Sequence, residues 1–261
     1  MGSTMTTTLA VANQKGGVAK TTSVASLGAA LAELGQKVLL VDLDPQACLT
    51  FSLGIDPEDL DVSVHHVLTK GLAPGEVLIE TEDGVDLLPA TIELARAEAD
   101  LLTRTGREQA IRAALELLDE HDLTYDWILL DCPPSLGVLT VAALTAADGV
   151  LIPLQCETLS HRGVGQLLDT VHDVRRFTNR GLQVWGVLPT LYDGRTNHAR
   201  RVLETISETY ELDVIEPPIP KTIKFAEAPA AGRSILSTSR SSKGAQAYRE
   251  VAANLVRRAA R

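Results

Sequence analysis

A glycine-rich turn between an apolar segment and a helical segment, near the start of the chain, most constrains the fold. The apolar segment at 8–13 predicts a buried strand, and residues 20–34 predict a helix that ends at Gly35. In the turn between them, Gly16 and Gly17 let the backbone approach a ligand closely and point its N–H groups inward. Because a helix that begins at such a turn presents its positive end to an anion, the sequence predicts a phosphate-binding loop.

The rest of the chain alternates short apolar segments with longer helical ones. This alternation predicts an α/β fold, a doubly wound and mostly parallel sheet with helices on both faces, with the ligand at the carboxyl ends of the strands. We expect a loop-rich, acidic segment at 51–84 and a short extended segment at 213–220. The expected strands are 37–44, 85–90, 127–131, 149–154 and 182–190, and the expected helices are 92–120 with a break near Gly106, 137–146, 162–177, 196–210 and 242–259.

Length and composition favour one domain in a reducing compartment. The 261 residues fit a single α/β domain over 8–261, whereas residues 1–7 are polar, and we expect them to be disordered or foreign to the fold. The 3 cysteines contain no CxxC pair, which argues against a disulfide framework or a structural zinc site. No run of 18 apolar residues and no signal-peptide pattern is present, so we expect a cytoplasmic protein.

Charge is distributed unevenly along the chain. The net charge is −10, but residues 1–194 carry 12 Lys+Arg against 27 Asp+Glu, and residues 195–261 carry 12 against 7. An acidic body with a basic C-terminal quarter is typical of a chain that presents one face to a polyanion, although an unevenly charged solvated surface explains the same numbers.

The phosphate loop carries residues suited to a nucleoside triphosphate and a metal ion. Lys20 would neutralise the β- and γ-phosphates, the Thr21 hydroxyl would bind Mg²⁺, and Thr22 would reach the α-phosphate. Gln14 and Ala19 stand where the two glycines of the common G-x-x-x-x-G-K-[ST] pattern would be. The predicted nucleotide contacts are Gly16, Gly17, Val18, Ala19, Lys20, Thr21 and Thr22.

Carboxylates end two of the predicted strands. Asp42 and Asp44 follow one strand and Asp131 ends another, so all three should lie in the ligand crevice. Asp131 would hold Mg²⁺ through water, because Mg²⁺ keeps much of its hydration shell. Cys132 has no evident His or Asn partner, so we expect a small core residue and no nucleophile. The adjacent histidines His65 and His66 show no metal-ligand spacing, and we expect solvated loop positions for them.

The loop sequence KGGVAKTT resembles the deviant Walker A motif of the ParA/MinD family of P-loop ATPases. VDLDPQ resembles the second ParA signature, and the similarity continues over about 8–255. The resemblance implies an ATPase with ATP and Mg²⁺ as cofactors, sandwiched in a homodimer. It implies that Lys15 reaches the nucleotide of the other subunit and neutralises transition-state charge there. It also implies that Asp44 orients the attacking water and that Asp42 helps to order the metal site.

Family resemblance also suggests where adenine and DNA would bind. Pro220, after a late extended segment, is the candidate adenine contact. Arg195 and Lys224 stand where chromosomal ParA proteins have DNA-contacting basic residues. Arginine is more usual at the second position; Lys224 supplies a point charge but lacks the forked pair of donors that arginine offers to a phosphate. Such contacts bind DNA without reading its sequence. Further candidates for this patch are Arg200, Arg201, Lys221, Arg233, Arg240 and Lys243.

The resemblance predicts a nucleoid-associated partition ATPase, released from double-stranded DNA when a ParB-type partner stimulates hydrolysis. One alternative is a MinD-like ATPase that binds membranes through its C-terminal helix. That helix has a small apolar face and no Phe or Trp anchor, so we expect it to pack on the sheet, with no membrane partner. A second alternative is a ParA-like ATPase that positions a protein cargo, which shares every motif. Nitrogenase iron protein has the same loop, but it needs a paired cysteine site that this chain lacks.

Overall fold

The computed structural model describes residues 6–121, 123–157 and 160–260. The expectation for residues 1–5 lies outside this range. Thr6 Oγ1 donates a hydrogen bond to the Tyr125 carbonyl (2.7 Å), and Thr7 begins the first strand, one residue before the expected start. The ordered fold therefore includes Thr6 and Thr7.

A seven-stranded sheet forms the centre of the described structure, in the order β3-β4-β2-β5-β1-β6-β7. Neighbouring strands are parallel except for β3 and β4, which pair antiparallel at one edge. The predicted doubly wound, mostly parallel sheet is confirmed. The strands are β1 (Thr7–Val11), β2 (Val38–Asp42), β3 (Ile79–Glu80), β4 (Asp86–Leu88), β5 (Trp127–Asp131), β6 (Gly149–Gln155) and β7 (Gln183–Thr190).

Alternating side chains along the central strands build two hydrophobic cores, one on each face of the sheet. In β1, Leu9 and Val11 point into one core and Ala10 into the other, and all three are fully buried. The strands are apolar on both faces because helices cover both, as parallel sheets require.

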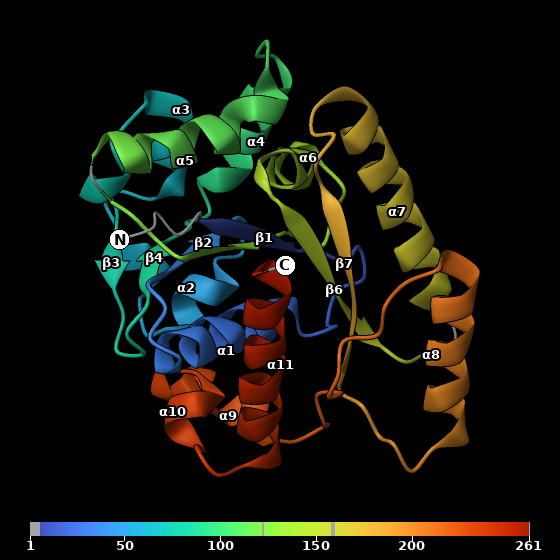
Figure 1. Ribbon diagram of the computed structural model, residues 1–261. Helices are drawn as coiled ribbons and strands as arrows, with labels where there is room; N and C mark the ends of the chain where they lie inside the picture. Colours follow the sequence, from blue (N-terminus) through green and yellow to red (C-terminus); the bar gives the residue numbers. More distant parts are fainter. Residues whose placement is uncertain (1–5, 122, 158–159, 261) are drawn as a thin grey trace.

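Helices cover both faces of the sheet (Figure 1). One core packs under α3 (Val64–Lys70), α4 (Leu94–Leu102), α5 (Ala110–Glu120), α6 (Val138–Ala146), α7 (Ser160–Phe177) and α8 (Asn197–Tyr210). The other packs under α1 (Lys20–Glu33), α2 (Cys48–Ser52), α10 (Ile235–Thr238) and α11 (Lys243–Ala259), with α9 (Lys224–Glu227) beside them. None of the described helices has both the length and the apolar character needed to cross a bilayer.

The segment at 51–84 is more ordered than its composition predicted. The Ser63 N–H donates to His66 Nδ1 (3.3 Å) at the start of α3, and Gly71 ends this helix with a left-handed φ of 67°. His65 is buried, with Nδ1 3.3 Å from the Glu93 carboxylate. The expectation of solvated loop positions for His65 and His66 is therefore wrong: both lie in α3, His65 is buried beside Glu93, and His66 accepts a hydrogen bond at the start of the helix.

The segment at 213–220 is extended, as expected, but it pairs with neighbouring residues through two isolated bridges and does not form a continuous strand. Val214 bridges Val187, and Pro220 bridges Tyr192. Two adjacent prolines, at 217 and 218, remove two N–H donors in its middle, so no continuous strand forms.

The C-terminal helix α11 is docked on α1. Its apolar residues Val251, Ala252 and Leu255 are buried in the core beneath α1. The Tyr248 hydroxyl lies 2.9 Å from Ser23 Oγ in a buried contact. The expectation that this helix packs inward is confirmed.

Candidate nucleotide-binding site

The predicted phosphate loop connects β1 to α1 at the carboxyl edge of the sheet, and two side chains and one backbone carbonyl hold it there. Asn13 Nδ2 donates to the Pro153 carbonyl (2.7 Å), and Asn13 Oδ1 accepts the Lys15 N–H (3.0 Å). Thr190 Oγ1, at the end of β7, donates to the Val18 carbonyl (2.9 Å). Asn13 and Thr190 were not predicted, because nothing local in the sequence shows that β6 and β7 end beside this loop.

Two loop residues adopt the left-handed backbone conformation. Gly17 has φ 73°, and Ala19, immediately before α1, has φ 62° and ψ 36°. A non-glycine residue in this region is strained by roughly 1–2 kcal/mol. The strain gives a physical reason for the glycine that the resembling family usually has at this position.

Lys20 lies under the loop. Its residue is only 7% exposed, and its Nζ is 3.4 Å from the Lys15 carbonyl oxygen. Burial lowers the pKa of Lys20, while the negative charges of Asp131 and Asp44 oppose this effect. The predicted phosphate ligand is thus held inside the loop with carboxylates near it.

Asp131 is fully buried and lacks a hydrogen-bond partner. Neither of its carboxylate oxygens accepts a hydrogen bond of ordinary geometry from the described residues. Burial raises its pKa well above the usual range, with Asp42 adding to the rise, while the nearby Thr21 hydroxyl and Lys20 oppose it. Buried carboxylates without partners are rare in proteins, and a hydrated cation satisfies such a group. The pair Asp131 and Thr21 therefore fits Mg²⁺.

Asp42 is also buried, but its oxygens are engaged. Oδ1 accepts the Asp44 N–H (3.1 Å), and Oδ2 accepts both the Thr50 N–H (2.9 Å) and the Thr50 hydroxyl (2.7 Å). Thr50 Oγ1 in turn accepts the Ala90 N–H (2.9 Å). Burial raises the pKa of Asp42 to about 6, against these hydrogen bonds, which lower it. Asp42 thus fixes the turn that carries Asp44, and Thr50 connects this turn to the chain after β4.

Asp44 follows Asp42 in a tight turn at the opening of the site. Its side chain is partly exposed, and Oδ1 accepts the Gln46 N–H (2.9 Å). The next turn places Ala47 in the left-handed region with φ 51° before α2 begins. One Asp44 oxygen is committed to this turn, and the turn holds the carboxylate near Lys20 and Asp131, whose pKa values it affects.

Lys15 differs from Lys20 in its surroundings. Its side chain lies on the open rim of the loop, and Nζ forms an ion pair with Glu157 Oε2 at 2.5 Å. Glu157 follows β6 and was not predicted, because it is 142 positions away in the sequence.

Pro220 lies beside the chain that leaves β7. The Tyr192 N–H donates to the Ile219 carbonyl (2.9 Å), and the Lys221 N–H donates to the Tyr192 carbonyl (3.3 Å). Pro220 is thereby held near the end of β7. The last residue of β7, Thr190, is also the one that donates a hydrogen bond to the Val18 carbonyl of the phosphate loop. The predicted adenine contact and the phosphate loop therefore share one edge of the sheet.

The predicted DNA-binding residues are exposed but do not form one continuous cluster. The 192–220 bridge brings the loop of Arg195 next to Lys221, and Arg200 Nη2 donates to the Gly194 carbonyl (3.1 Å). Arg195 is paired with Asp193 at 2.9 Å, and hydrogen bonds from Arg195 lower the pKa of Asp193 to about 2. Arg200 and Arg201 are carried by α8, Lys224 by α9 and Lys243 by α11; in Figure 1, α8 lies at the lower right, α9 at the bottom, and α11 rises from the bottom to the middle of the molecule.

Two candidate positions are less suited to that surface. Arg233 forms an ion pair with Glu82 across to the β3–β4 turn. Arg240 is exposed, but its carbonyl accepts a hydrogen bond from Arg249 Nη1 (2.6 Å) near the α1–α11 contact. Cys132, by contrast, behaves as expected: it is a buried core residue, and burial raises its thiol pKa.

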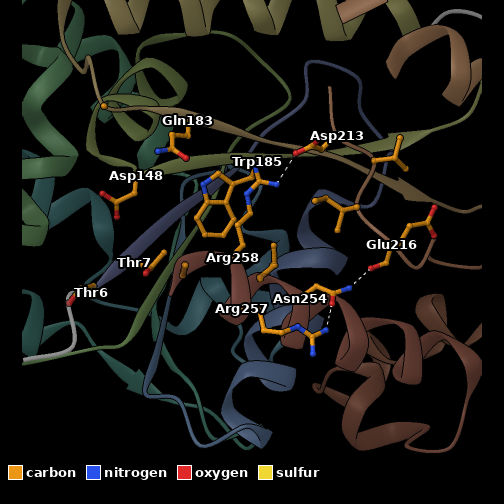
Figure 2. A pocket seen from close by; sticks show the side chains of 15 residues that line it. Thr6, Thr7, Asp148, Gln183, Trp185, Asp213, Glu216, Asn254, Arg257 and Arg258 are labelled. Carbon is orange, nitrogen blue, oxygen red and sulfur yellow. Dashed lines mark hydrogen bonds and ion pairs between the residues drawn. The ribbon is translucent and has the colours of Figure 1, made fainter. Parts of the chain in front are cut away.

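A hollow of about 950 Å³ lies at the opposite, amino-terminal edge of the sheet. Figure 2 shows its lining, in which Thr7 and Gln183 begin strands and Asp148 precedes β6. Trp185 forms part of the wall, and Arg258 pairs with Asp213 at 3.1 Å. None of the predicted nucleotide contacts lines it, so this hollow is separate from the phosphate loop.

Comparisons with known proteins agree with this geometry. The family model described as an AAA domain matches residues 6–184. The chain is 42% identical over 251 residues to the sporulation initiation inhibitor protein Soj of Bacillus subtilis, covering 94% of this chain and 98% of Soj. It is 38% identical over 251 residues to the chromosome partitioning protein ParA of Caulobacter vibrioides, covering 96% and 94%.

A solved structure resembles the whole chain. It is named cobyrinic acid a,c-diamide synthase, from Mycobacterium smegmatis, with bound ATP analogue and magnesium. The two share 56% sequence identity with a TM-score of 0.86, covering 97% of this chain and 95% of that one.

Fold and site together define a P-loop ATPase whose phosphate loop carries a second lysine. The chain belongs to the ParA/Soj family of chromosome-partitioning ATPases, within the ParA/MinD superfamily.

Proposed function

We propose that this protein is a DNA-bound partition switch. Two copies sandwich ATP between them, the dimer binds double-stranded DNA without sequence preference, and hydrolysis stimulated by a ParB-type partner releases it. The observation that carries the proposal is the contrast between two lysines of one loop. Lys20 is buried where its own nucleotide would lie, whereas the Lys15 side chain is 32% exposed and would be open to a second copy.

The residues around the loop support Mg²⁺-dependent ATP hydrolysis. The Thr21 hydroxyl and Asp131 would hold Mg²⁺, which would neutralise negative charge on the phosphates. Backbone N–H groups of the loop and Lys20 would bind the phosphate oxygens. Thr22 would contact the α-phosphate, and Pro220 would lie against the adenine. The buried, unpartnered oxygens of Asp131 support the metal assignment.

Asp44 would orient the attacking water. Asp42 would hold Asp44 in place for this role. The three hydrogen bonds that Asp42 accepts support a positioning role more than direct metal ligation. Lys15 of the second copy would neutralise charge that develops on the transferred phosphoryl group.

The exposed basic residues of the C-terminal quarter support DNA as the partner. Arg195, Arg200 and Lys221 lie around one loop, and Lys224 follows closely in the chain. Arg195 would exchange its exposed Asp193 partner for a phosphate, because water screens an exposed ion pair and leaves it with little net stability. Arg233 is a weaker candidate because it is already paired with Glu82. These contacts would place the protein in the cytoplasm, on the nucleoid.

Membrane binding through α11 has less support. The apolar side chains that would enter a bilayer are buried against α1, and Arg249 pairs with Glu33 of α1 at 2.5 Å. Releasing this helix would expose its buried apolar face and break the Tyr248–Ser23 contact.

The test is binding to random-sequence duplex DNA with ATP, with ADP and without nucleotide, repeated as salt increases. We expect binding only with ATP, weakening steeply with salt because lysines and arginines displace counterions. Equal binding in all nucleotide states, or none, would contradict the proposal. Anionic liposomes in the same three states test the membrane alternative, and α11 would have to undock for them to bind.

The name of the mycobacterial relative suggests a second function, amide synthesis on a corrinoid acid. The 56% identity to that protein is the observation that favours it. ATP turnover measured with DNA, and separately with cobyrinic acid and glutamine, distinguishes the two functions. We expect DNA and a ParB-type partner to stimulate turnover, and the acid to have no effect. Whether the cargo is a chromosome, a plasmid or a protein depends on that partner.

A further inference from the structure

Lys15 is anchored at both ends within its own chain. Its backbone N–H donates to Asn13 Oδ1 (3.0 Å), and its Nζ lies 2.5 Å from Glu157 Oε2. The side chains of Lys15 and Glu157 are 32% and 50% exposed, so the ion pair is open to solvent and to an approaching molecule. A loop lysine that acts only as a solvated charge would need no such partner.

The start of α7 closes against the same part of the loop. A Cβ at Gly163 would lie 3.2 Å from Asn13 Oδ1 and 4.0 Å from Lys15 Cβ. This close approach sets α7 directly against the backbone of residues 13–15. Lys15 therefore lies between Glu157, which follows β6, and Gly163, which is near the start of α7.

This arrangement conflicts with a role for Lys15 in the second subunit. One ammonium group at 2.5 Å from a carboxylate in its own chain must leave that carboxylate before it reaches a phosphate across an interface. We propose that Glu157 is a latch for Lys15, holding it in the single chain and releasing it when the ATP dimer forms. This inference rests on the proposed function.

The γ-phosphate gives the latch its nucleotide selectivity. A triphosphate offers several charged oxygens to the incoming ammonium, and charge-assisted hydrogen bonds to them outweigh one solvent-exposed carboxylate. ADP lacks the oxygens nearest the predicted position of Lys15, so the lysine stays on Glu157. ATP therefore releases Lys15 from Glu157, whereas ADP does not.

The expected size of the effect follows from population arithmetic. A competing internal contact weakens dimerisation: the measured association constant is the intrinsic one multiplied by the fraction of chains in which Lys15 is free. An exposed ion pair is worth about 0.2–1 kcal/mol, which is roughly 1.4- to 5-fold for each latch. Because both subunits must release a lysine, removing the latch should tighten the dimer by about 2- to 25-fold.

The experiment compares the full chain with Glu157→Gln and with Glu250→Gln, a matched control that removes the same charge from an exposed position on α11. Dimerisation in Mg-ATP and in Mg-ADP is measured by sedimentation over a concentration series at low and high salt. Acylation of Lys15 by an activated ester, followed by mass spectrometry of the nucleotide-free protein, reports on the ion pair independently of dimerisation.

We expect Glu157→Gln to acylate faster at Lys15 and to dimerise in ATP at lower concentration, with the second effect shrinking at high salt. Glu250→Gln should match the wild type in both measurements. Unchanged acylation overturns the ion pair, and unchanged or weaker dimerisation overturns the latch. A wild-type chain that stays monomeric in ATP would instead refute the proposed function, and the latch with it, whatever acylation shows.

A double substitution separates the latch from a general charge effect. Lys15→Ala should abolish the ATP dimer, and Lys15→Ala with Glu157→Gln should be no better, because no lysine remains to be released. If Glu157→Gln restored dimerisation in the Lys15→Ala chain, then Glu157 would act by simple repulsion across the interface, and the latch would be overturned.

Discussion

Asp42 and Asp131 are register partners at the ends of the neighbouring strands β2 and β5, yet only Asp42 is hydrogen-bonded within the described structure. Both are buried, burial raises the pKa of both carboxyl groups, and the charge of Asp42 adds to the rise at Asp131. The nucleotide-free chain therefore carries an electrostatic strain that a bound cation would relieve.

Asp131→Asn should stabilise the nucleotide-free protein. Because burial raises the folded-state pKa of Asp131, the folded chain takes up a proton at higher pH than the unfolded chain, so this group destabilises the fold most at high pH. Each unit of pKa elevation corresponds to about 1.4 kcal/mol. Thermal unfolding should show a gain for Asp131→Asn that is absent in acid, grows as the pH rises from the unfolded-state pKa to the raised folded-state pKa, and stays constant above it. Asp42, with its pKa raised to about 6, contributes in the same direction between its unfolded value and about 6.

The same substitution should remove the stabilisation that Mg-ATP gives. Ligands that bind only the folded state raise the melting temperature, and Asp131→Asn removes the carboxylate assigned to Mg²⁺. A variant that is less stable without nucleotide, or equally stabilised by Mg-ATP, would contradict the role given to Asp131.

Thr50→Val should impair hydrolysis without touching the phosphate loop. Thr50 Oγ1 donates to Asp42 and accepts from the Ala90 N–H. Valine therefore removes one of the two donors to Asp42 Oδ2 and leaves the buried Ala90 N–H without a partner, the latter at about 1–3 kcal/mol. We expect a lower turnover number with ATP affinity little changed, because the Asp44 turn loosens. Thr50→Ser keeps the hydroxyl and should retain most activity; equal turnover in the valine variant would refute the positioning role.

Ala19→Gly should stabilise the protein by about 1 kcal/mol, because Ala19 has a left-handed φ of 62° that glycine adopts without strain. Ala32→Gly, within helix α1, is the contrasting control and should destabilise by roughly 0.5–1 kcal/mol. Chemical denaturation of both variants measures the difference. A loss of stability in Ala19→Gly would show that the loop relaxes out of this conformation.

Lys224→Ala should weaken ATP-dependent DNA binding equally for all sequences and reduce the salt slope by about 1. Arg180→Ala, an exposed arginine at the opposite edge of the sheet, is the control and should leave both unchanged. Arg233→Ala should have a smaller effect than Lys224→Ala, since Arg233 is paired with Glu82. Equal losses in Lys224→Ala and Arg180→Ala would indicate a general charge effect.

The sequence was informative where function depends on residues close together in the chain. The strand–glycine turn–helix pattern predicted the phosphate loop, and carboxylates at strand ends predicted the site that Asp42, Asp44 and Asp131 form. Parallel strands bring their ends to one edge, so local patterns there translate directly into spatial neighbours.

Contacts between distant segments were not predictable in the same way. Thr50, Thr190 and Glu157 all support the site, but their partners depend on which strand ends meet. Helix α3 was missed because His66 occupies the capping position where glutamate or glutamine is the usual signal. The left-handed Ala19 also has no local signature, since alanine itself favours a helix.

The most direct test of the central claim is sedimentation of Asp44→Ala and of Asp44→Ala with Lys15→Ala in Mg-ATP. Because Asp44 is assigned to the attacking water, the single variant should bind ATP, hydrolyse it poorly and remain dimeric. The double variant should bind ATP and remain monomeric, because no lysine crosses to the other nucleotide. A double variant that is as dimeric as Asp44→Ala would contradict the assignment of Lys15 to the second subunit.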